Sequence, residues 1–349
     1  MKGKEEKNKL GKLDREDFRR LIAPELEVGP PFLVPPAFGQ DFGAIRLDED
    51  GVLVVSSDPL AINPQLGWKR SGRLALQVVA SDVALSGIAP EFISTNWNLP
   101  PEVSGEDFRA MWKGFCETAR AREIKIAGGH TGRYGEATLP IVGGGTAFGL
   151  GKKADLLSGE PRAGDELVLF NKLGLEAAGI LAFYFPEKVS SLVGPEAVQE
   201  AKLSFDSLDP VLHFKKLART AGAKAVHDLA EGGLLGGLQE LLGRRKDGPG
   251  LRLKTEKIEI KEAVGNITRS LDLDPLKITS TGSALVLLDC QAEKYGKKLQ
   301  AEGLEVTPLG RLTASGEIEL ERQGEISHLK EPVQDRFWEV FGELNREKD

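Results

Sequence analysis

Long apolar runs and cysteines are scarce in this sequence of 349 residues. Because no run of about 18 apolar residues occurs, no membrane-spanning helix is predicted. The charged first residues lead into no apolar segment of the kind that a secretory signal needs. The two cysteines, Cys116 and Cys290, are too few for a disulfide scaffold or a cysteine-rich zinc site. We therefore expect a soluble, cytoplasmic protein.

Several familiar catalytic motifs are also missing. The sequence has no Gly-x-x-x-x-Gly-Lys-Ser/Thr phosphate loop and no Gly-x-Gly-x-x-Gly dinucleotide fingerprint after a strand. It has no His-Glu-x-x-His pair for zinc and no Gly-x-Ser-x-Gly elbow for an acyl-transfer serine. The net charge of −7, from 46 basic and 53 acidic residues, gives no basic footprint for nucleic acid.

Glycine, in contrast, is abundant. The chain has 41 glycines, whereas ordinary usage near 7% would give about 24. Nine of them lie within 128–151 and seven within 232–250. Consecutive glycines let backbone amides approach an anion closely. The sequence therefore predicts one anion-binding turn in each of these two regions.

The order of segments predicts two domains that mix strands and helices. The length suits two domains, and 40% hydrophobic with 28% charged residues is typical of globular proteins. Helical patterns occur at 13–22, 74–87, 104–119, 174–184, 195–220, 233–243 and 337–344. Ser104 is the expected N-cap of the third of these, whose apolar stripe places Cys116 in the core, and Cys290 stands at the end of the strand pattern at 284–288. Strand patterns occur at 52–55, 124–126, 137–142, 146–150, 166–170, 224–226, 284–288 and 318–320. This alternation favours an α/β or α+β fold, with a linker at 151–165.

Three aspartates stand near predicted element ends. Asp41 lies in a glycine-rich loop, Asp58 closes a strand, and Asp82 lies near the end of a helix. Magnesium prefers oxygen ligands and is usually held by a few carboxylates together with substrate phosphates. Convergence of the three aspartates would supply such a site. Aspartate is also favoured as a cap of turns and helices, and the sequence leaves that alternative open.

The first glycine-rich block reads Gly128-Gly129-His130-Thr131-Gly132 after a predicted strand. Its backbone amides, with His130 and Thr131, would contact phosphate oxygens. The alternative is a tight hairpin.

The second block reads His227-Asp228-x-x-Glu231-Gly232-Gly233 at a strand-to-helix junction. A helix start with small residues can bind phosphate, while Asp228 and Glu231 could equally be helix caps. The other two histidines, at 213 and 328, are interpreted as structural.

Five short blocks follow one another in a specific order. They are Gly39-Gln40-Asp41, Ser57-Asp58, Ser81-Asp82 through Ser86-Gly87-Ile88-Ala89-Pro90, Gly128-Gly129-His130-Thr131, and the His227 block. Together they resemble the superfamily of aminoimidazole ribonucleotide (AIR) synthetase, thiamine-monophosphate kinase, selenophosphate synthetase and the hydrogenase maturation factor. The closest branch is the maturation factor, which the chain also resembles at Gly132-Arg133-Tyr134 and Gly174-Leu175-Glu176-Ala177.

The resemblance implies a two-domain fold, with an N-terminal ATP-binding domain at 29–152 after a tail and helix at 1–28, and a C-terminal α+β domain at 153–349. The N-terminal sheet would form a barrel across a homodimer. ATP and Mg²⁺ are the implied cofactors. The implied metal ligands are Asp41, Asp58 and Asp82. The implied catalytic residues are Asp82, His130, His227 and Asp228. The implied nucleotide contacts include Asp41 and Asp58 together with Gly39, Gly128, Gly129, His130, Thr131, Gly232 and Gly233.

Three departures from the family pattern matter. Many members have two acids where this chain has Gln40-Asp41, and many maturation factors have Asp where it has His130. A neutral imidazole is a poor magnesium ligand, so His130 is expected to touch phosphate. The carbamoyl-carrying factor ends in a tail with a terminal cysteine, and this sequence ends without one. Dehydration of a carbamoylated tail is therefore not the expected reaction.

Three functions remain open. The first is an ATP- and Mg²⁺-dependent enzyme that activates a carbonyl-type or phosphate oxygen of a small-molecule or protein-bound substrate, in metal-centre maturation. The second is a synthetase or kinase of the purine or thiamine pathway. The third is a non-catalytic, ATP-gated partner in assembly, acting with a maturation partner protein.

Overall fold

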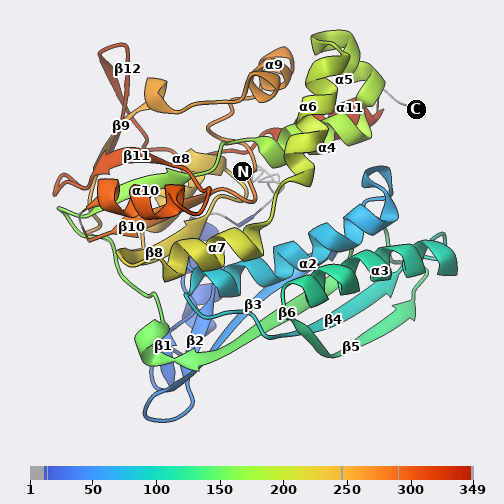
Figure 1. Ribbon diagram of the computed structural model, residues 1–349, viewed down its shortest axis with the longest axis horizontal. Helices are drawn as coiled ribbons and strands as arrows, with labels where there is room; N and C mark the ends of the chain where they lie inside the picture. The colour runs from blue at the N-terminus through green and yellow to red at the C-terminus, as the bar shows by residue number, and fades with distance from the viewer. Residues whose placement is uncertain (1–11, 14, 245–246, 290, 347–349) are drawn as a thin grey trace, which may run out of the picture.

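The computed structural model describes residues 12–13, 15–244, 247–289 and 291–346, which form two sheet-centred halves sharing one core (Figure 1). Six strands make the first sheet, in the spatial order β1-β2-β3-β6-β4-β5. All neighbouring strands in it are antiparallel except β4 and β5. The strands are β1 (Phe32–Val34), β2 (Gly43–Arg46), β3 (Gly51–Ala61), β4 (Phe92–Leu99), β5 (Lys125–Arg133) and β6 (Ile141–Lys152).

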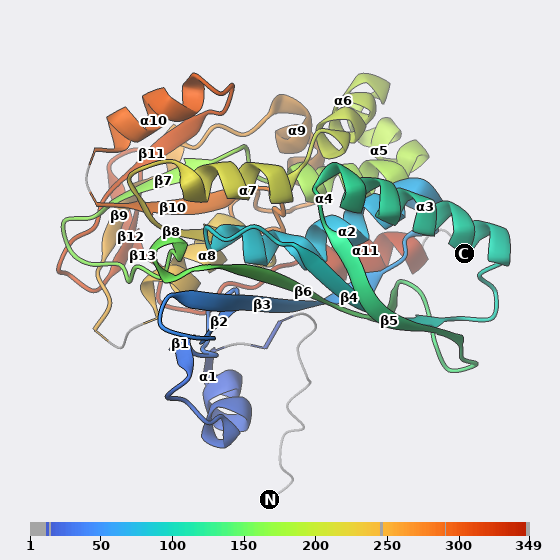
Figure 2. The same ribbon diagram turned by 60° about the horizontal axis from the view of Figure 1, so that its bottom comes forward.

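Helices α2 (Trp68–Leu85) and α3 (Gly105–Ala121) cover one face of this sheet (Figures 1 and 2). The Ser104 hydroxyl caps α3 by accepting a hydrogen bond from the backbone N–H of Asp107, as the sequence predicts. Cys116, predicted to lie in the core, is only half-buried on this helix.

The glycines of β6 correct one prediction. We expected two strands separated by Gly143-Gly144-Gly145, yet β6 runs unbroken through these residues. A Cβ on Gly145 would lie 2.9 Å from Val79 of α2, and one on Gly149 would lie 2.6 Å from Ala89 O. These glycines therefore allow the helix layer to pack closely on the sheet. They do not form a turn.

The Gly128–Gly132 block also differs from its prediction. It lies inside β5, where Gly129 pairs with Thr95 and His130 with Asn96 of β4, so neither an anion-binding turn nor a hairpin forms. Eight of the nine β5 residues are exposed, which leaves this edge strand uncovered in the single chain.

The second face of the first sheet carries no helix layer among the described residues; only the short N-terminal helices lie on that side, beyond β1 and β2 (Figure 2). Alternation along the strands places Leu53 and Val55 of β3 with Phe148 and Leu150 of β6 on this open face. Leu150 is 45% exposed.

Two further sheets build the second half. One has the order β11-β7-β10-β8 and the other β13-β12-β9. Their strands are β7 (Glu166–Phe170), β8 (Ala223–Asp228), β9 (Leu251–Lys254), β10 (Ala284–Leu288), β11 (Val306–Arg311), β12 (Ile318–Arg322) and β13 (Glu325–His328). Val168 and Val286 face the core shared with α2, whereas Leu167 and Leu285 face a second core against α8 (Gly233–Leu242). The sheet is thus buried on both sides.

The remaining helices surround these sheets. They are α1 (Arg15–Asp17), α4 (Leu175–Tyr184), α5 (Pro186–Val193), α6 (Pro195–Asp206), α7 (Pro210–Arg219), α9 (Glu262–Ser270), α10 (Ala292–Gln300) and α11 (Phe337–Arg346), with short helices at Phe18–Ile22, Ala23–Glu25, Pro64–Leu66, Lys153–Asp155 and Thr255–Lys257. The single helix predicted at 195–220 is two helices, because Asp209 caps a new start at α7. The mixed α/β architecture that we predicted is confirmed.

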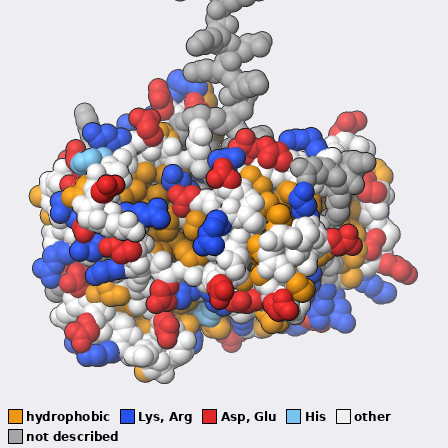
Figure 3. Space-filling view, turned by 90° about the horizontal axis from the view of Figure 1, so that it is seen from above, with side chains coloured by type: hydrophobic (Ala, Val, Ile, Leu, Met, Phe, Trp, Pro, Cys, Tyr) orange, Lys and Arg blue, Asp and Glu red, His pale blue; other side chains and the backbone are white. Residues whose placement is uncertain are grey.

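Within the described part of the chain, no helix is both long enough and apolar enough to cross a membrane. On the face shown in Figure 3, basic and acidic side chains are interspersed around hydrophobic patches, and neither sign of charge dominates.

Candidate functional site

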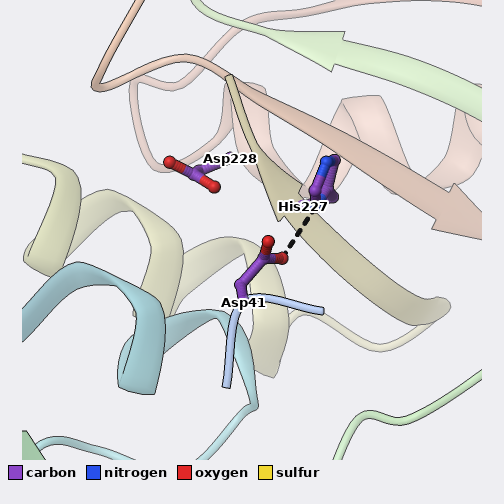
Figure 4. A group of neighbouring side chains, drawn as sticks. All are labelled: Asp41, His227 and Asp228. Atoms are coloured by element: carbon purple, nitrogen blue, oxygen red, sulfur yellow. Dashed lines mark hydrogen bonds and ion pairs between the residues drawn. The ribbon is translucent and has the colours of Figure 1, made fainter. Parts of the chain in front are cut away.

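The centre of the site is a contact between the two halves of the chain. Asp41 lies in the loop between β1 and β2, and its Oδ2 is 2.7 Å from Nδ1 of His227, on β8 (Figure 4). His227 is fully buried, and the Asp41 side chain is only 4% exposed. The metal-binding atoms of Asp41, His227 and Asp228 all lie within 4.8 Å of one another.

Helix α8 supplies the other side of this contact. Nε2 of His227 lies 3.2 Å from Oε2 of Glu240. The two atoms form an ion pair, but their geometry does not meet the criteria for a hydrogen bond. The Arg244 guanidinium donates to Gly39 O at 2.9 Å and lies 3.6 Å from Asp41. Gly39 has a φ of +73°, and a Cβ there would lie 2.7 Å from Glu240 O. Only glycine fits where this loop meets α8.

The two carboxylates hold a charge on His227. Burial alone would lower the pKa of His227, but Asp41 and Glu240 outweigh it and raise that pKa to about 9. Burial alone would raise the pKa of Glu240, yet the imidazolium and Lys12 bring it to about 2. His227 is therefore a buried cation that links carboxylates from both halves.

Three more aspartates add negative charge to the same region. Asp58 of β3 points to the face that α2 covers, Asp82 lies on α2, and Asp228 ends β8. Burial, with repulsion from Asp41, raises the pKa of Asp58 to about 6 and that of Asp228 to about 7. Burial and the neighbouring aspartates also raise the pKa of Asp82 well above its usual range.

The charge and the donor atoms of this cluster suit a divalent cation, although among the described residues Asp58 and Asp82 fall in no group whose ligand atoms all lie within 4.8 Å of one another. Oδ2 of Asp58 is buried and finds no hydrogen-bond partner among the described residues. Carboxylates that repel one another in a shared buried space are stabilised when a cation neutralises them. The donor set consists of hard oxygen atoms, which suits Mg²⁺.

Lys12 reaches the cluster from the N-terminal end of the described chain. Its backbone N–H donates to Oε2 of Glu231 at 2.7 Å, and its Nζ lies 3.0 Å from Oε1 of Glu240. Burial alone would lower the pKa of Lys12, but the attraction of Glu240, Asp228 and Asp41 raises it above its usual range. Lys12 is thus a cation held against the acidic cluster.

The structure does not bring the Gly128–Thr131 block to the aspartates of the same chain. Strands β6 and β4 lie between β3 and β5, so three strand spacings, about 14 Å along the sheet, separate Asp58 from β5. His130 bonds through Nε2 to the Tyr134 hydroxyl at 2.7 Å and is exposed. The assigned roles of Gly128, Gly129, His130 and Thr131 stay predictions.

The second glycine block lies beside the cluster, at the start of α8. Gly232 and Gly233 have φ values of +81° and +55°, and a Cβ on Gly233 would lie 2.5 Å from Ile278 O. Glycine is required here for the backbone conformation and for a close approach. Whether this helix start also contacts nucleotide stays a prediction.

Sequence reasoning missed Lys12, Glu240 and Arg244. Glu240 lies in the last turn of α8, and Arg244 follows two residues after the helix ends. In the sequence they are two opposite charges four residues apart near a predicted helix end, which was the available signal. Nothing in the sequence around Lys12 indicates its contact.

Comparison with known proteins decides the family. Residues 39–154 match the family model "AIR synthase related protein, N-terminal domain", and residues 162–323 match "AIR synthase related protein, C-terminal domain". The chain belongs to the AIR synthase related family. The family predicted from the five sequence blocks is confirmed, including the similarity to its hydrogenase maturation branch.

Relatives from two branches of the family match most of the chain. Carbamoyl dehydratase HypE of Escherichia coli strain K12 is 28% identical over 277 residues, 78% of this chain and 77% of that protein. Thiamine-monophosphate kinase of Pyrococcus abyssi is 23% identical over 308 residues, 84% of this chain and 88% of that protein. A crystal structure of hydrogenase maturation protein HypE in complex with ATP has a TM-score of 0.66 at 20% identity, covering 85% of this chain and 89% of that one. The AIR-synthase-like fold is thereby confirmed.

Proposed function

We propose that this chain is an ATP- and Mg²⁺-dependent enzyme that activates a carbonyl-type or phosphate oxygen of its substrate. The observation that carries the proposal is the buried cluster of Asp41, Asp58, Asp82 and Asp228 where the two halves meet. The family supports it, because its relatives include a kinase and a HypE structure bound to ATP.

Asp41, Asp58, Asp82 and Asp228 would hold the cation. Bound Mg²⁺ neutralises the charge on nucleotide phosphates during phosphoryl transfer. His227 is then a positioning residue, because both of its ring nitrogens are occupied by carboxylates. It fixes the Asp41 carboxylate toward the cluster, while Arg244 holds the Gly39–Asp41 loop. Preorganised charge of this kind is the main contribution of the protein to phosphoryl transfer.

We further propose that the working unit is a homodimer joined through the first sheet. The open face exposes apolar side chains such as Leu150, and the β5 edge has unpaired backbone groups. A second copy seated there would cover both features. Within one chain, the glycines of β5 lie too far from Asp58 to contact a nucleotide bound there. In the dimer they could contact the nucleotide bound by the second copy.

The substrate is proposed to be a small molecule or a group on another protein. Helix α11 packs Phe337, Val340 and Leu344 into a core with α4, α5 and α9, so the described C-terminal segment is anchored. Cys116 is half-buried on α3, where burial raises the pKa of its thiol. Cys290, which the sequence placed at the end of a strand, lies outside the described residues. The maturation partner protein stays a prediction.

A turnover assay tests this function against its alternatives. The purified chain is incubated with ATP and Mg²⁺, with or without thiamine monophosphate, a formylated purine precursor, or extracts separated into small molecules and proteins. Substrate-stimulated release of ADP or AMP that is lost in Asp82→Ala supports an enzyme, and the stimulating fraction identifies the branch. Tight ATP binding without turnover in any fraction, together with a stable protein complex, would favour the ATP-gated assembly partner.

A further inference from the structure

The segment 329–336, here called the strap, connects β13 to α11 and runs along α8, from Gly232 at its start to Gln239 near its end. The Gln239 side chain of α8 binds it at two points. Its Nε2 donates to Glu331 O at 2.7 Å, and its Oε1 accepts the backbone N–H of Val333 at 3.0 Å. The strap is thus attached to the same helix that carries Glu240.

Asp335 of the strap touches the second glycine block directly. Its Oδ2 accepts the backbone N–H of Gly232 at 3.1 Å, and its Oδ1 accepts that of Phe337 at 2.9 Å. Gly232 follows Glu231, whose carboxylate accepts the Lys12 N–H, and it lies four residues after Asp228. One carboxylate therefore connects the first turn of α11 to the loop that leaves the acidic cluster.

The contact matters because it adds a side-chain bond to a glycine pair whose backbone already bonds Gly233 N–H to Ala230 O and Gly236 N–H to Gly232 O. Gly232 and Gly233 both have positive φ values, and glycine pairs populate many backbone conformations. A cavity of about 640 Å³ separates the strap from parts of the loop 272–278, with Lys277, Lys330 and Arg336 among its lining. On that side the strap is held through Arg336, which donates to Asp272 at 2.9 Å. On the other side its hydrogen bonds to α8 and Gly232 hold it.

We propose that Asp335 is a positioning residue for the nucleotide site, acting through Gly232 to fix the direction of Glu231 and of the α8 start. This inference rests on the proposed ATP- and Mg²⁺-dependent function. It extends that function by making the C-terminal strap part of the site's support. Asp335 itself does not touch the nucleotide.

The test compares Asp335→Asn with the matched control Asp272→Asn. The control removes an acid that pairs with Arg336 of the same strap, at 2.9 Å, but its side chain is 95% exposed and touches neither glycine. Three properties are measured for each: the thermal midpoint, the affinity for Mg²⁺-ATP by calorimetry, and amide hydrogen exchange of residues 229–235. Gln239→Leu is a second variant that loosens the strap and leaves Asp335 intact.

We expect Asp335→Asn to speed exchange at 229–235 and to weaken Mg²⁺-ATP binding at least tenfold while the protein remains fully folded. Asp272→Asn should stay within twofold of wild type, and Gln239→Leu should lie between them. If Asp335→Asn does not fold, the hydrogen exchange and the Mg²⁺-ATP affinity of Gln239→Leu decide the question. Wild-type affinity in a folded strap variant overturns the positioning role and leaves the proposed function intact, whereas a wild type that binds no nucleotide overturns both.

Discussion

Asp41 and His227 lie 186 residues apart in the chain and share a buried hydrogen bond of 2.7 Å. This bond joins the loop before the second strand of the first sheet to the end of a strand in the second sheet. With Glu240 on the opposite ring nitrogen, it places a positive charge between Asp41 and Glu240 and beside Asp228. The junction between the halves is thus built from the residues that we propose to serve ATP chemistry.

The charge on His227 predicts a pH dependence of stability. Its pKa of about 9 in the folded chain exceeds the unfolded value of 6.5, so its contribution is fully present below pH 6.5 and is lost as pH rises through about 9. The free energy of unfolding should fall by about 3 kcal/mol across that range. Denaturant unfolding at a series of pH values measures it. Glu240→Gln should flatten the slope, whereas Glu317→Gln, which removes the partner of exposed His328, should not.

The acidic cluster predicts a conflict between stability and ligand binding. At pH 8 the metal-free fold carries the cost of a buried Asp58 charge, which burial and, to a lesser degree, repulsion from Asp41 express as a pKa raised to about 6. Asp58→Asn should therefore stabilise the metal-free protein, by about 1–2 kcal/mol, and should abolish the stabilisation that Mg²⁺ gives to wild type. Thermal unfolding in chelator and in Mg²⁺ tests both effects. Exposed Asp50, changed to Asn, is the control, and an equal response to Mg²⁺ in both variants would count against the site.

Substitutions at two glycines test packing and ligand contact separately. Gly145→Ala would place a Cβ 2.9 Å from Val79, so we expect a loss of about 1–3 kcal/mol in the free energy of unfolding. A Cβ on Gly128 meets nothing within 4 Å, so Gly128→Ala should leave stability unchanged. If β5 contacts nucleotide in the dimer, Gly128→Ala should nevertheless weaken ATP binding. Unchanged affinity would remove this block from the site.

The open sheet face predicts the effect of a charge on assembly. Leu150 is 45% exposed on this face, and Leu203 of α6 is 60% exposed on the other half of the chain. Leu150→Glu should convert a dimer into monomers because it places a charge in an apolar interface. Leu203→Glu should leave the dimer intact. Sedimentation equilibrium distinguishes the two, and a monomeric wild type would refute the dimer directly.

Much of the fold follows from local patterns. The buried strand at 166–170, the cap at Ser104 and the tail helix at 337–344 were each predicted because their signals lie within a few residues. The glycine-rich runs at 128–132 and 143–145 were misinterpreted, because in the sequence a glycine that permits close packing in a sheet looks like one that permits a turn. The segment 128–132 shows this, since tertiary pairing with β4 makes it a strand.

The site was predictable in its parts but not in its assembly. Asp41, His227 and Asp228 were identified by motif, and the structure brings them together. The sequence does not show which helix the Gly39–Asp41 loop contacts, and this contact is what brings Lys12, Glu240 and Arg244 to the site. These three residues were missed for that reason. The pairing of His227 with two carboxylates likewise depends on packing between segments that are distant in the sequence.

Calorimetric titration of the wild-type chain with ATP, in the presence and in the absence of Mg²⁺, tests the central claim most directly. We predict one saturable site per chain with Mg²⁺, strong weakening when the metal is chelated, and loss of the Mg²⁺-dependent part in Asp58→Ala and Asp82→Ala. No binding heat at millimolar ATP with Mg²⁺ would contradict the account.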